Sequence, residues 1–232
     1  GIAIIEENLL NKINAVHESI TVATVPPFSV VKEKQILATV KIIPFSAPEE
    51  SVTTAVNYSH DTVPLVNVSQ FRDRSVGLIQ TTGSSIQEKV LNKTLLTITH
   101  RVERYGAGLK HEIRCPHLQS EVSKAIQVLL KNGSELILIV GASAIVDRRD
   151  VIPSAIEETG GYIERFGMPV DPGNLLLLAY NNKVPIIGAP GCARSPKFNG
   201  FDSVLARLLA DIQINASDIG SMGSGGLLTE LD

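Results

Sequence analysis

The residues best suited to binding or transferring a charged group follow the apolar, β-favouring run Ile137–Val140. Small residues occupy 141–143 directly after that run, and the carboxylates Asp147 and Asp150 come within the next few positions. Small side chains let a ligand approach the backbone, whose N–H groups bind phosphate where a helix begins. A carboxylate in the same loop can hold Mg²⁺. The stretch therefore predicts a binding site for an anionic, polar ligand at the end of a buried strand.

Four segments that follow predicted strands share this composition of small residues with Gly or Pro. The last of them adds the cations Arg194 and Lys197 and the hydroxyl of Ser195. In a mainly parallel sheet the first two segments open on the carboxyl edge together, and the other two can converge there. The four segments are Thr81–Ser85, Gly141–Asp150, Pro169–Gly173 and Gly188–Lys197.

Several of these residues also have a purely structural interpretation. Asp150 stands just before a predicted helix at 151–159, where a carboxylate can cap the first turn. Arg148 and Arg149 suit a solvated pair better than a pair of ligands. Cys192 has no histidine near it in the sequence, so a small, half-buried residue is favoured over a nucleophile. These alternatives stay open at the level of sequence.

Alternating strands and helices begin at Ser75 and predict an α/β structure of three layers around a mostly parallel sheet. The runs Leu175–Tyr180 and Val184–Ile187 form a predicted hairpin, which adds an antiparallel piece and makes the sheet mixed. The other strands are predicted at 76–81, 109–115, 137–140 and 162–166, and the helices at 86–105, 118–130, 151–159 and 201–212.

The first third of the chain, residues 1–73, is predicted to be a separate, small β-rich segment before an α/β domain at 74–232. Apolar residues at helical spacing predict an amphipathic helix at 2–16. Proline ends each of the first two predicted strands, as expected for a residue that cannot continue a ladder. The remaining elements of this segment are strands at 20–25, 36–43 and 64–68 and a helix at 49–58.

Composition excludes several classes of function. The chain has 232 residues, is 44% hydrophobic and carries a net charge of −3, so no basic field favours nucleic acid. No apolar run approaches the roughly 18 residues of a membrane span. Cys115 and Cys192 lie far apart without a zinc-ligand spacing, which favours a reduced, cytoplasmic compartment.

Short motifs between residues 76 and 212 resemble, in their order, the molybdopterin-binding domain shared by molybdopterin adenylyltransferases and molybdenum insertases, including gephyrin. In that family a TG turn is followed by Pro-Asp, then GG(T/S) with a nearby Asp, then Pro-Gly, then LPGNP. Here the motifs stand as Thr82-Gly83, Pro116-His117, Gly141-Ala142-Ser143 with Asp147 and Asp150, Pro172-Gly173 and Ala189-Pro190-Gly191.

Nearly the whole chain is similar to a subgroup of bacterial molybdopterin-binding proteins that are often fused to a MobA-like nucleotidyltransferase domain. The segments ITVATVPPF, ATVKIIPF, GASAIVDRRDVIP, FGMPVDPGNLLLL and PGCARSPKFNGFD carry this resemblance. Since the chain opens at Gly1 without a methionine, the resemblance predicts a middle piece of a longer protein.

The chain departs from the family pattern at three points. His117 replaces the Asp of Pro-Asp, a carboxylate that the enzymes use near the pterin and metal. Ala142 replaces the second Gly of the GG turn, and LPGNP becomes APGCA with Arg194 and Lys197 soon after. Loss of a carboxylate weakens metal-assisted transfer, whereas added cations favour holding a phosphate. Binding therefore survives these changes better than catalysis.

The resemblance implies a domain that binds molybdopterin or the molybdenum cofactor during cofactor biosynthesis. Its ligand, a pterin-phosphate small molecule, would pass to a fused or separate nucleotidyltransferase. The enzyme alternative is an active molybdopterin adenylyltransferase or molybdenum insertase that uses Mg²⁺. A third alternative is an interaction domain that has lost its ligand. Relatives associate as dimers or trimers, so a homo-oligomer is also implied.

The resemblance also assigns roles to individual residues. Asp150 and Asp147 are the candidate catalytic carboxylates, and Asp150 is the candidate metal ligand. The candidate cofactor-binding residues are Thr82, Gly83, Ser84, Gly141, Ala142, Ser143, Pro172, Gly173, Pro190, Gly191, Arg194, Ser195 and Lys197.

Overall fold

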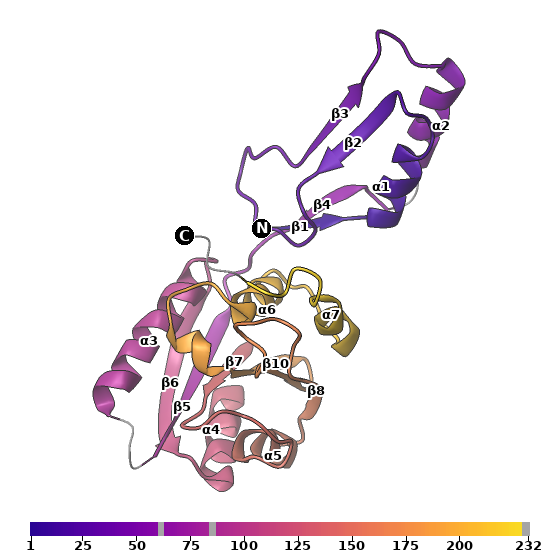
Figure 1. Ribbon diagram of the computed structural model, residues 1–232. Helices are drawn as coiled ribbons and strands as arrows, with labels where there is room; N and C mark the ends of the chain where they lie inside the picture. Colours follow the sequence, from indigo (N-terminus) through magenta and orange to yellow (C-terminus); the bar gives the residue numbers. More distant parts are fainter. Residues whose placement is uncertain (60–62, 84–86, 229–232) are drawn as a thin grey trace. The chain divides into compact units, whose positions relative to one another are not determined.

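A computed structural model describes residues 1–59, 63–83 and 87–228 of the chain, which forms two compact units (Figure 1). The first unit comprises Gly1–Phe71 and the second Arg72–Asp232. Each unit has its own buried apolar core.

The first unit consists of two antiparallel strand pairs and two helices. Strand β1 (Ile2–Ile5) pairs with β4 (Val66–Ser69), and β2 (Ile20–Thr24) pairs with β3 (Ala38–Ile42). Helices α1 and α2 complete the unit, and their bounds are Glu7–Asn14 and Glu49–Ser59.

The predicted helix at 2–16 is wrong at its start. Ile2 and Ala3 are fully buried in strand β1, and the helix begins only at Glu7. The partner strand β4 comes from the far end of the unit, so a pattern read locally does not reveal the pairing. Leu9 and Ile13 form the buried face of α1, as their helical spacing predicts.

The second unit is built on a six-stranded mixed sheet with the order β6-β5-β7-β10-β9-β8. Strands β6, β5, β7 and β10 run parallel, whereas β9 is antiparallel to both of its neighbours. The predicted hairpin of β9 and β10 is confirmed. The strands are β5 (Ser75–Thr82), β6 (Gly108–Pro116), β7 (Leu136–Val140), β8 (Tyr162–Phe166), β9 (Leu177–Asn181) and β10 (Val184–Ala189).

Helices α4 (Gln119–Lys131) and α5 (Val151–Glu158) cover one face of this sheet. Alternate residues of the central strand β7, Ile137 and Ile139, pack with residues of these helices in one buried core cluster. Because strand side chains alternate between faces, the other residues of β7 face the opposite layer.

Helices α3 (Glu88–Glu103) and α6 (Gly200–Leu209) cover the opposite face and are joined by an ion pair between Arg101 and Asp202. Gln80 of β5 donates from its side chain to a backbone carbonyl of α3. The three-layer α/β/α architecture and mixed sheet are therefore as predicted (Figure 1).

The strand register brings the small-residue segments to one edge of the sheet. Gln80, Val140 and Ala189 form one row near the carboxyl ends of β5, β7 and β10. Strand β8 runs in the same direction, because β9 is antiparallel to both β8 and β10. All four segments predicted to carry chemistry therefore begin at this edge.

Two short helices were not predicted. The 3-10 helix η1 (Gly191–Arg194) follows β10, and α7 (Ala216–Ser221) begins with a capping box between Asn215 and Asp218. Within the residues described, no helix is both long and apolar enough to cross a membrane.

Candidate functional site

A histidine joins the ends of three neighbouring strands at the carboxyl edge. The Nδ1 atom of His117, which follows β6, lies 2.8 Å from the Oγ1 atom of Thr81 in β5. Its Nε2 atom lies 3.1 Å from the Oγ atom of Ser143, which follows β7. The backbone N–H of Ala142 donates to Thr81 Oγ1 over 2.7 Å. These contacts fix the segment after β7 against those after β5 and β6.

The predicted ligand-binding residues after β5 and β7 lie close together. A Cβ atom added to Gly83 would stand 3.8 Å from the Cβ atom of Ala142. At Gly141 an added Cβ atom would stand 2.6 Å from the carbonyl oxygen of Ser143, so only glycine fits there. Thr82, the other residue of the TG turn, donates its hydroxyl proton to the Cys115 carbonyl. The predicted site residue Ser84 lies outside the described residues.

Asp150 organises the loop before α5. Its Oδ2 atom accepts hydrogen bonds from the backbone N–H groups of Val146, at 2.7 Å, and Asp147, at 2.9 Å. Asp150 occupies the N-cap position of α5, yet its side chain makes no capping hydrogen bond. The side-chain cap considered from sequence is therefore wrong, because this carboxylate is turned toward the preceding loop.

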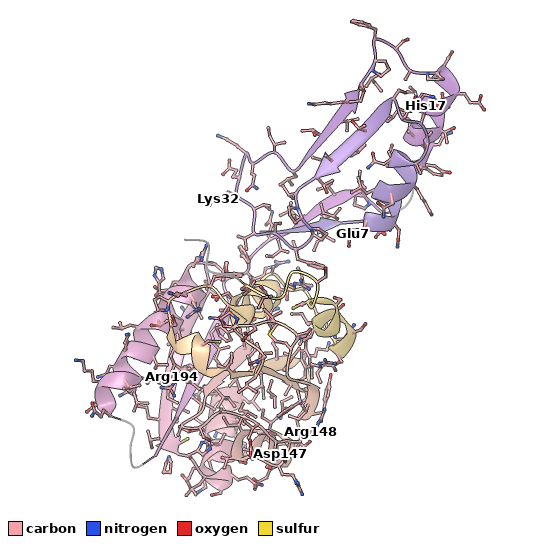
Figure 2. All side chains as sticks on the ribbon, in the orientation of Figure 1. Glu7, His17, Lys32, Asp147, Arg148 and Arg194 are labelled. Carbon is pink, nitrogen blue, oxygen red and sulfur yellow. The ribbon has the colours of Figure 1, made fainter. Side chains whose placement is uncertain are left out.

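The other candidate catalytic carboxylate, Asp147, is a surface residue. Its side chain pairs with Arg149, whose side chain is 92% exposed. The backbone N–H and then the guanidinium of Arg149 hold the pKa of Asp147 below its usual range. Figure 2 shows Asp147 and Arg148 on the loop before α5, well apart from Arg194. The structure therefore does not bring Asp147 together with the cationic segment.

Arg194, at the end of η1, reaches back to the segment after β7. One guanidinium nitrogen donates over 2.8 Å to the carbonyl oxygen of Gly141, and another lies 3.4 Å from Thr94 Oγ1. Burial lowers the pKa of Arg194, although a guanidinium remains charged near neutral pH. Among the described residues it has no carboxylate partner within ion-pair distance. Its positive charge is therefore available to an anion.

A second arginine, Arg101, was not predicted from the sequence, and its guanidinium is bonded to a carboxylate and to two backbone carbonyls. Its side chain is buried and forms an ion pair with Asp202, the Nε–Oδ1 distance being 2.7 Å. The same guanidinium donates to the carbonyl oxygens of Ala193, at 2.9 Å, and Lys197, at 2.8 Å. Arg101 therefore holds in place the segment that carries Arg194.

The N-terminus of α6 completes this support. Asn199 and Asp202 form a capping box, and the amide of Asn199 donates to the carbonyl oxygens of Cys192 and Lys197. The spacing Asn-x-x-Asp was visible in the sequence as a helix-start signal. The partner of Asp202, Arg101, was not visible, because it lies on another helix.

Pro172 and Gly173 lie against the start of α6. The carbonyl oxygen of Pro172 accepts from the backbone N–H of Gly200 at 2.9 Å. Gly173 has a φ of +138°, and a Cβ atom there would stand 2.9 Å from Gly200 Cα. This Pro-Gly pair therefore supports the helix start behind the 191–197 segment.

The residues around η1 differ in their surroundings. The carbonyl oxygen of Pro190 accepts from the N–H of Ala193. No atom of the described residues stands within 4 Å of a Cβ atom added to Gly191. Ser195 Oγ accepts from the backbone N–H of Lys197 at 3.3 Å. Burial raises the pKa of Cys192, so its thiol is not activated as a nucleophile.

Asp150 is the candidate ligand for Mg²⁺. In the described part of the chain, no group of at least three His, Cys, Asp or Glu side chains is arranged to hold a metal ion. Asp150 uses Oδ2 for the loop and leaves Oδ1 as an acceptor. One such oxygen fits Mg²⁺ that keeps several waters and is shared with a ligand phosphate.

No protein-family model and no curated protein matches the sequence. Solved structures do match. A molybdopterin biosynthesis moea protein from Pyrococcus horikosii is 16% identical, with a TM-score of 0.45 over 88% of this chain and 53% of its own. The chain thus spans about half the length of that protein.

Two shorter proteins match the chain in part. A putative molybdenum cofactor biosynthesis protein from Corynebacterium diphtheriae is 16% identical over 58% of this chain and 90% of its own, with a TM-score of 0.37. A molybdopterin biosynthesis protein from Mycobacterium abscessus is 11% identical over 61% and 94%, with a TM-score of 0.41.

Proposed function

We propose that this chain binds molybdopterin or the molybdenum cofactor during cofactor biosynthesis, and that it holds the anionic end of the ligand at the carboxyl edge of its sheet. The observation that carries this proposal is the half-buried guanidinium of Arg194, which has only neutral partners among the described residues. An anionic oxygen forms stronger, charge-assisted hydrogen bonds with a guanidinium than a neutral carbonyl does.

The resemblance of the short motifs supports this ligand, and Gly141 of the motif after β7 lies in contact with Arg194. Ser143 is exposed and Gly141 contacts Arg194, so a phosphate at this point meets both a hydroxyl and a guanidinium. Ser195 and Lys197 lie on the same segment as Arg194, and we propose that they close over the anionic end.

The proposal favours binding over catalysis. The position where the family has a second carboxylate carries His117, and Asp147 is turned to Arg149 on the surface. Phosphoryl and molybdate transfer require charge neutralisation by positioned groups and metal ions. A single carboxylate, Asp150, is left for that work in the described site.

The test is retention of molybdopterin by the purified chain, measured by fluorescence after anaerobic gel filtration. Arg194→Ala should weaken binding by at least about tenfold, as expected for the loss of charge-assisted hydrogen bonds. Arg149→Ala is the matched control, because that side chain is 92% exposed and removes the same charge elsewhere. Equal retention by the parent and Arg194→Ala would contradict the proposal.

An enzyme that uses Mg²⁺ is the second candidate, favoured by the open Oδ1 atom of Asp150. In that case incubation with molybdopterin, Mg-ATP and molybdate yields adenylylated or metallated product, and Asp150→Asn abolishes it. If the parent gives no product but retains molybdopterin, only the binding function stands. If it does neither, the chain is an interaction domain that has lost its ligand.

Transfer of the bound ligand to a nucleotidyltransferase, fused or separate, extends the proposal, as do a cytoplasmic location and a homo-oligomeric state. Addition of a MobA-like nucleotidyltransferase to the loaded chain should deplete its retained molybdopterin. Sedimentation of the chain at several concentrations gives the oligomeric state.

A further inference from the structure

His117 forms hydrogen bonds with the hydroxyl groups of both Thr81 and Ser143. The neighbouring groups determine which atom is the donor in each of these two bonds. A neutral imidazole carries one N–H donor and one acceptor nitrogen. If Nδ1 accepts from Thr81, Nε2 carries the proton and donates to Ser143. If Nδ1 carries the proton, Nε2 accepts from Ser143. In the first arrangement the Ser143 hydroxyl proton is free to be donated to a ligand. In the second the proton is used by Nε2, and the hydroxyl offers a ligand only its lone pairs.

The hydrogen bonds of Thr81 select the first arrangement. Thr81 is 0% exposed, so its hydroxyl proton requires an acceptor inside the protein. The N–H of Ala142 already donates to Thr81 Oγ1, which uses an acceptor position and not the proton. Among the described residues, the acceptor within hydrogen-bonding distance of that proton is Nδ1 of His117, at 2.8 Å. The Nδ1 atom therefore accepts, and the imidazole proton is on Nε2.

We propose that His117 is held as the neutral Nε2–H tautomer and turns the Ser143 hydroxyl outward as a hydrogen-bond donor to an oxyanion of the ligand. His117 is thus a positioning residue, and Ser143 is the group that touches the ligand. In naming a phosphate-type oxyanion this inference rests on the proposed function. The tautomer itself follows from the protein alone.

Two further observations agree with a neutral ring. Burial lowers the pKa of His117, while the charge of Asp150 acts more weakly in the opposite sense. A second proton on Nδ1 would also displace the hydrogen bond from Thr81, which has no other acceptor among the described residues. The ring therefore stays neutral near pH 7.

A carboxylate in place of His117 would reverse the hydrogen bond with Ser143. An ionised carboxylate only accepts hydrogen bonds, so the Ser143 hydroxyl would donate inward and present its lone pairs to the ligand. Such a site would suit a cation, and the present site suits an anion.

The tautomer can be measured directly on the ¹⁵N-labelled chain without ligand. Long-range ¹H–¹⁵N correlation distinguishes a protonated from an unprotonated ring nitrogen, and His117→Asn identifies the signals by their loss. Protonated Nε2 with unprotonated Nδ1 is the expected result. A protonated Nδ1 in the folded chain would overturn the proposal.

Two substitutions separate the donor role from mere packing. The Gln side chain can place an N–H near the position of Nε2, and the Asn side chain can place an acceptor near that of Nδ1. His117→Gln should therefore retain affinity for inorganic phosphate within about threefold of the parent, whereas His117→Asn should lose about fivefold, the loss of one hydrogen bond. Equal losses in both variants would contradict a donor role for Nε2.

His117→Asp tests the polarity of the site. It should bind inorganic phosphate more weakly than His117→Asn, because a carboxylate repels the anion as well as lacking the donor. Phosphate affinity equal to that of the parent would overturn the role of His117.

The failure of this inference and of the proposed function are distinguishable. If Nδ1 is protonated and molybdopterin binding is intact, the inference about His117 is contradicted and the proposed function stands. If Nε2 is protonated but the chain binds neither phosphate nor molybdopterin, the proposed function and the ligand contact of Ser143 are both contradicted.

Discussion

The two edges of the large sheet both carry arginines, but they use them differently. At the amino edge Arg74 and Arg72 pair with the carboxylate of Asp211, the Arg72 Nε atom lying 3.5 Å from Asp211 Oδ2. At the carboxyl edge Arg194 donates to the neutral carbonyl of Gly141. At the first edge both arginines share a carboxylate partner, whereas at the second Arg194 has only neutral partners among the described residues.

The largest part of this contrast concerns the amino edge, where a cavity lies beside side chains that are already paired. A cavity of about 400 Å³ opens at the amino edge, between the strand starts and the end of α6. Tyr162, Tyr180 and Asp211 are among its lining residues, and Asp211 already forms an ion pair with Arg74 there. The carboxyl edge is the better candidate, because Arg194 at that edge has no carboxylate partner among the described residues.

The largest effect is expected where an arginine of the carboxyl edge is buried and paired. Arg101→Met leaves the carboxylate of Asp202 buried without its ion pair and frees the segment from Ala193 to Lys197. We expect a loss of about 3–5 kcal/mol in the free energy of unfolding, measured by urea denaturation. Weaker molybdopterin binding should accompany it, since Arg194 is no longer held.

The double substitution Arg101→Met with Asp202→Asn is the control for that experiment. The amide keeps an oxygen for the backbone N–H of Asn199 and carries no uncompensated charge. It should recover part of the lost stability. If Arg101→Met alone lowers stability by less than about 1 kcal/mol, the ion pair is not the support that holds the segment.

A smaller effect is expected from the carboxylate that shapes the loop before α5. Asp150→Ala removes the acceptor for the backbone N–H groups of Val146 and Asp147, with an expected loss of about 1–2 kcal/mol. Faster amide hydrogen exchange at those two residues would report the loosened loop. Asp150→Asn, which keeps an acceptor oxygen, should retain most of the stability. Unchanged exchange in Asp150→Ala would show that other contacts hold the loop.

At the amino edge the ion pairs are more exposed, and the expected effect is smaller again. Asp211→Asn removes both pairs and keeps a residue type that tolerates the observed φ of +61°. We expect a loss of less than about 1 kcal/mol in thermal or urea unfolding. Molybdopterin affinity should stay as in the parent, so a clear loss of affinity would undo the distinction between the two edges.

The smallest effect is a pH dependence from His117. Its pKa is lowered in the folded chain, so the unfolded chain binds the proton more readily. Stability should therefore fall as the pH drops below about 6.5, the ordinary value for histidine. His117→Asn should flatten this part of the stability curve. A steeper decline in His117→Asn than in the parent would contradict the direction of the shift.

The sequence predicted most of the large unit because each of its elements carries a regular pattern. The buried run of β7 and the apolar spacing of α4 identify a strand and a helix without reference to any partner. β1 was missed because Ile2 and Ala3 gain their burial from a strand distant in sequence. Short helices such as η1 have too few residues for a periodic signal.

The candidate site was predictable only in part. The segments that meet at the carboxyl edge follow from strand order, so Thr82, Gly141 and Ser143 were within reach of sequence reasoning. The partners of Arg101 were not, since a buried ion pair depends on the packing of two helices. The direction of the Asp150 side chain was also undetermined by the sequence. The first turn of α5 and the preceding loop both offer backbone N–H groups within a few residues of Asp150.

The contact between Arg194 and the Gly141 carbonyl bears on how quickly the proposed anionic ligand can bind and dissociate. An incoming oxyanion competes with a neutral acceptor, so its capture does not require an internal ion pair to dissociate. On departure the same carbonyl takes up the guanidinium again, which spares the empty chain an unsolvated charge. Under the proposed function the chain binds and releases its ligand repeatedly. The Gly141 carbonyl then favours this function, because it keeps the guanidinium of Arg194 oriented while the ligand dissociates quickly.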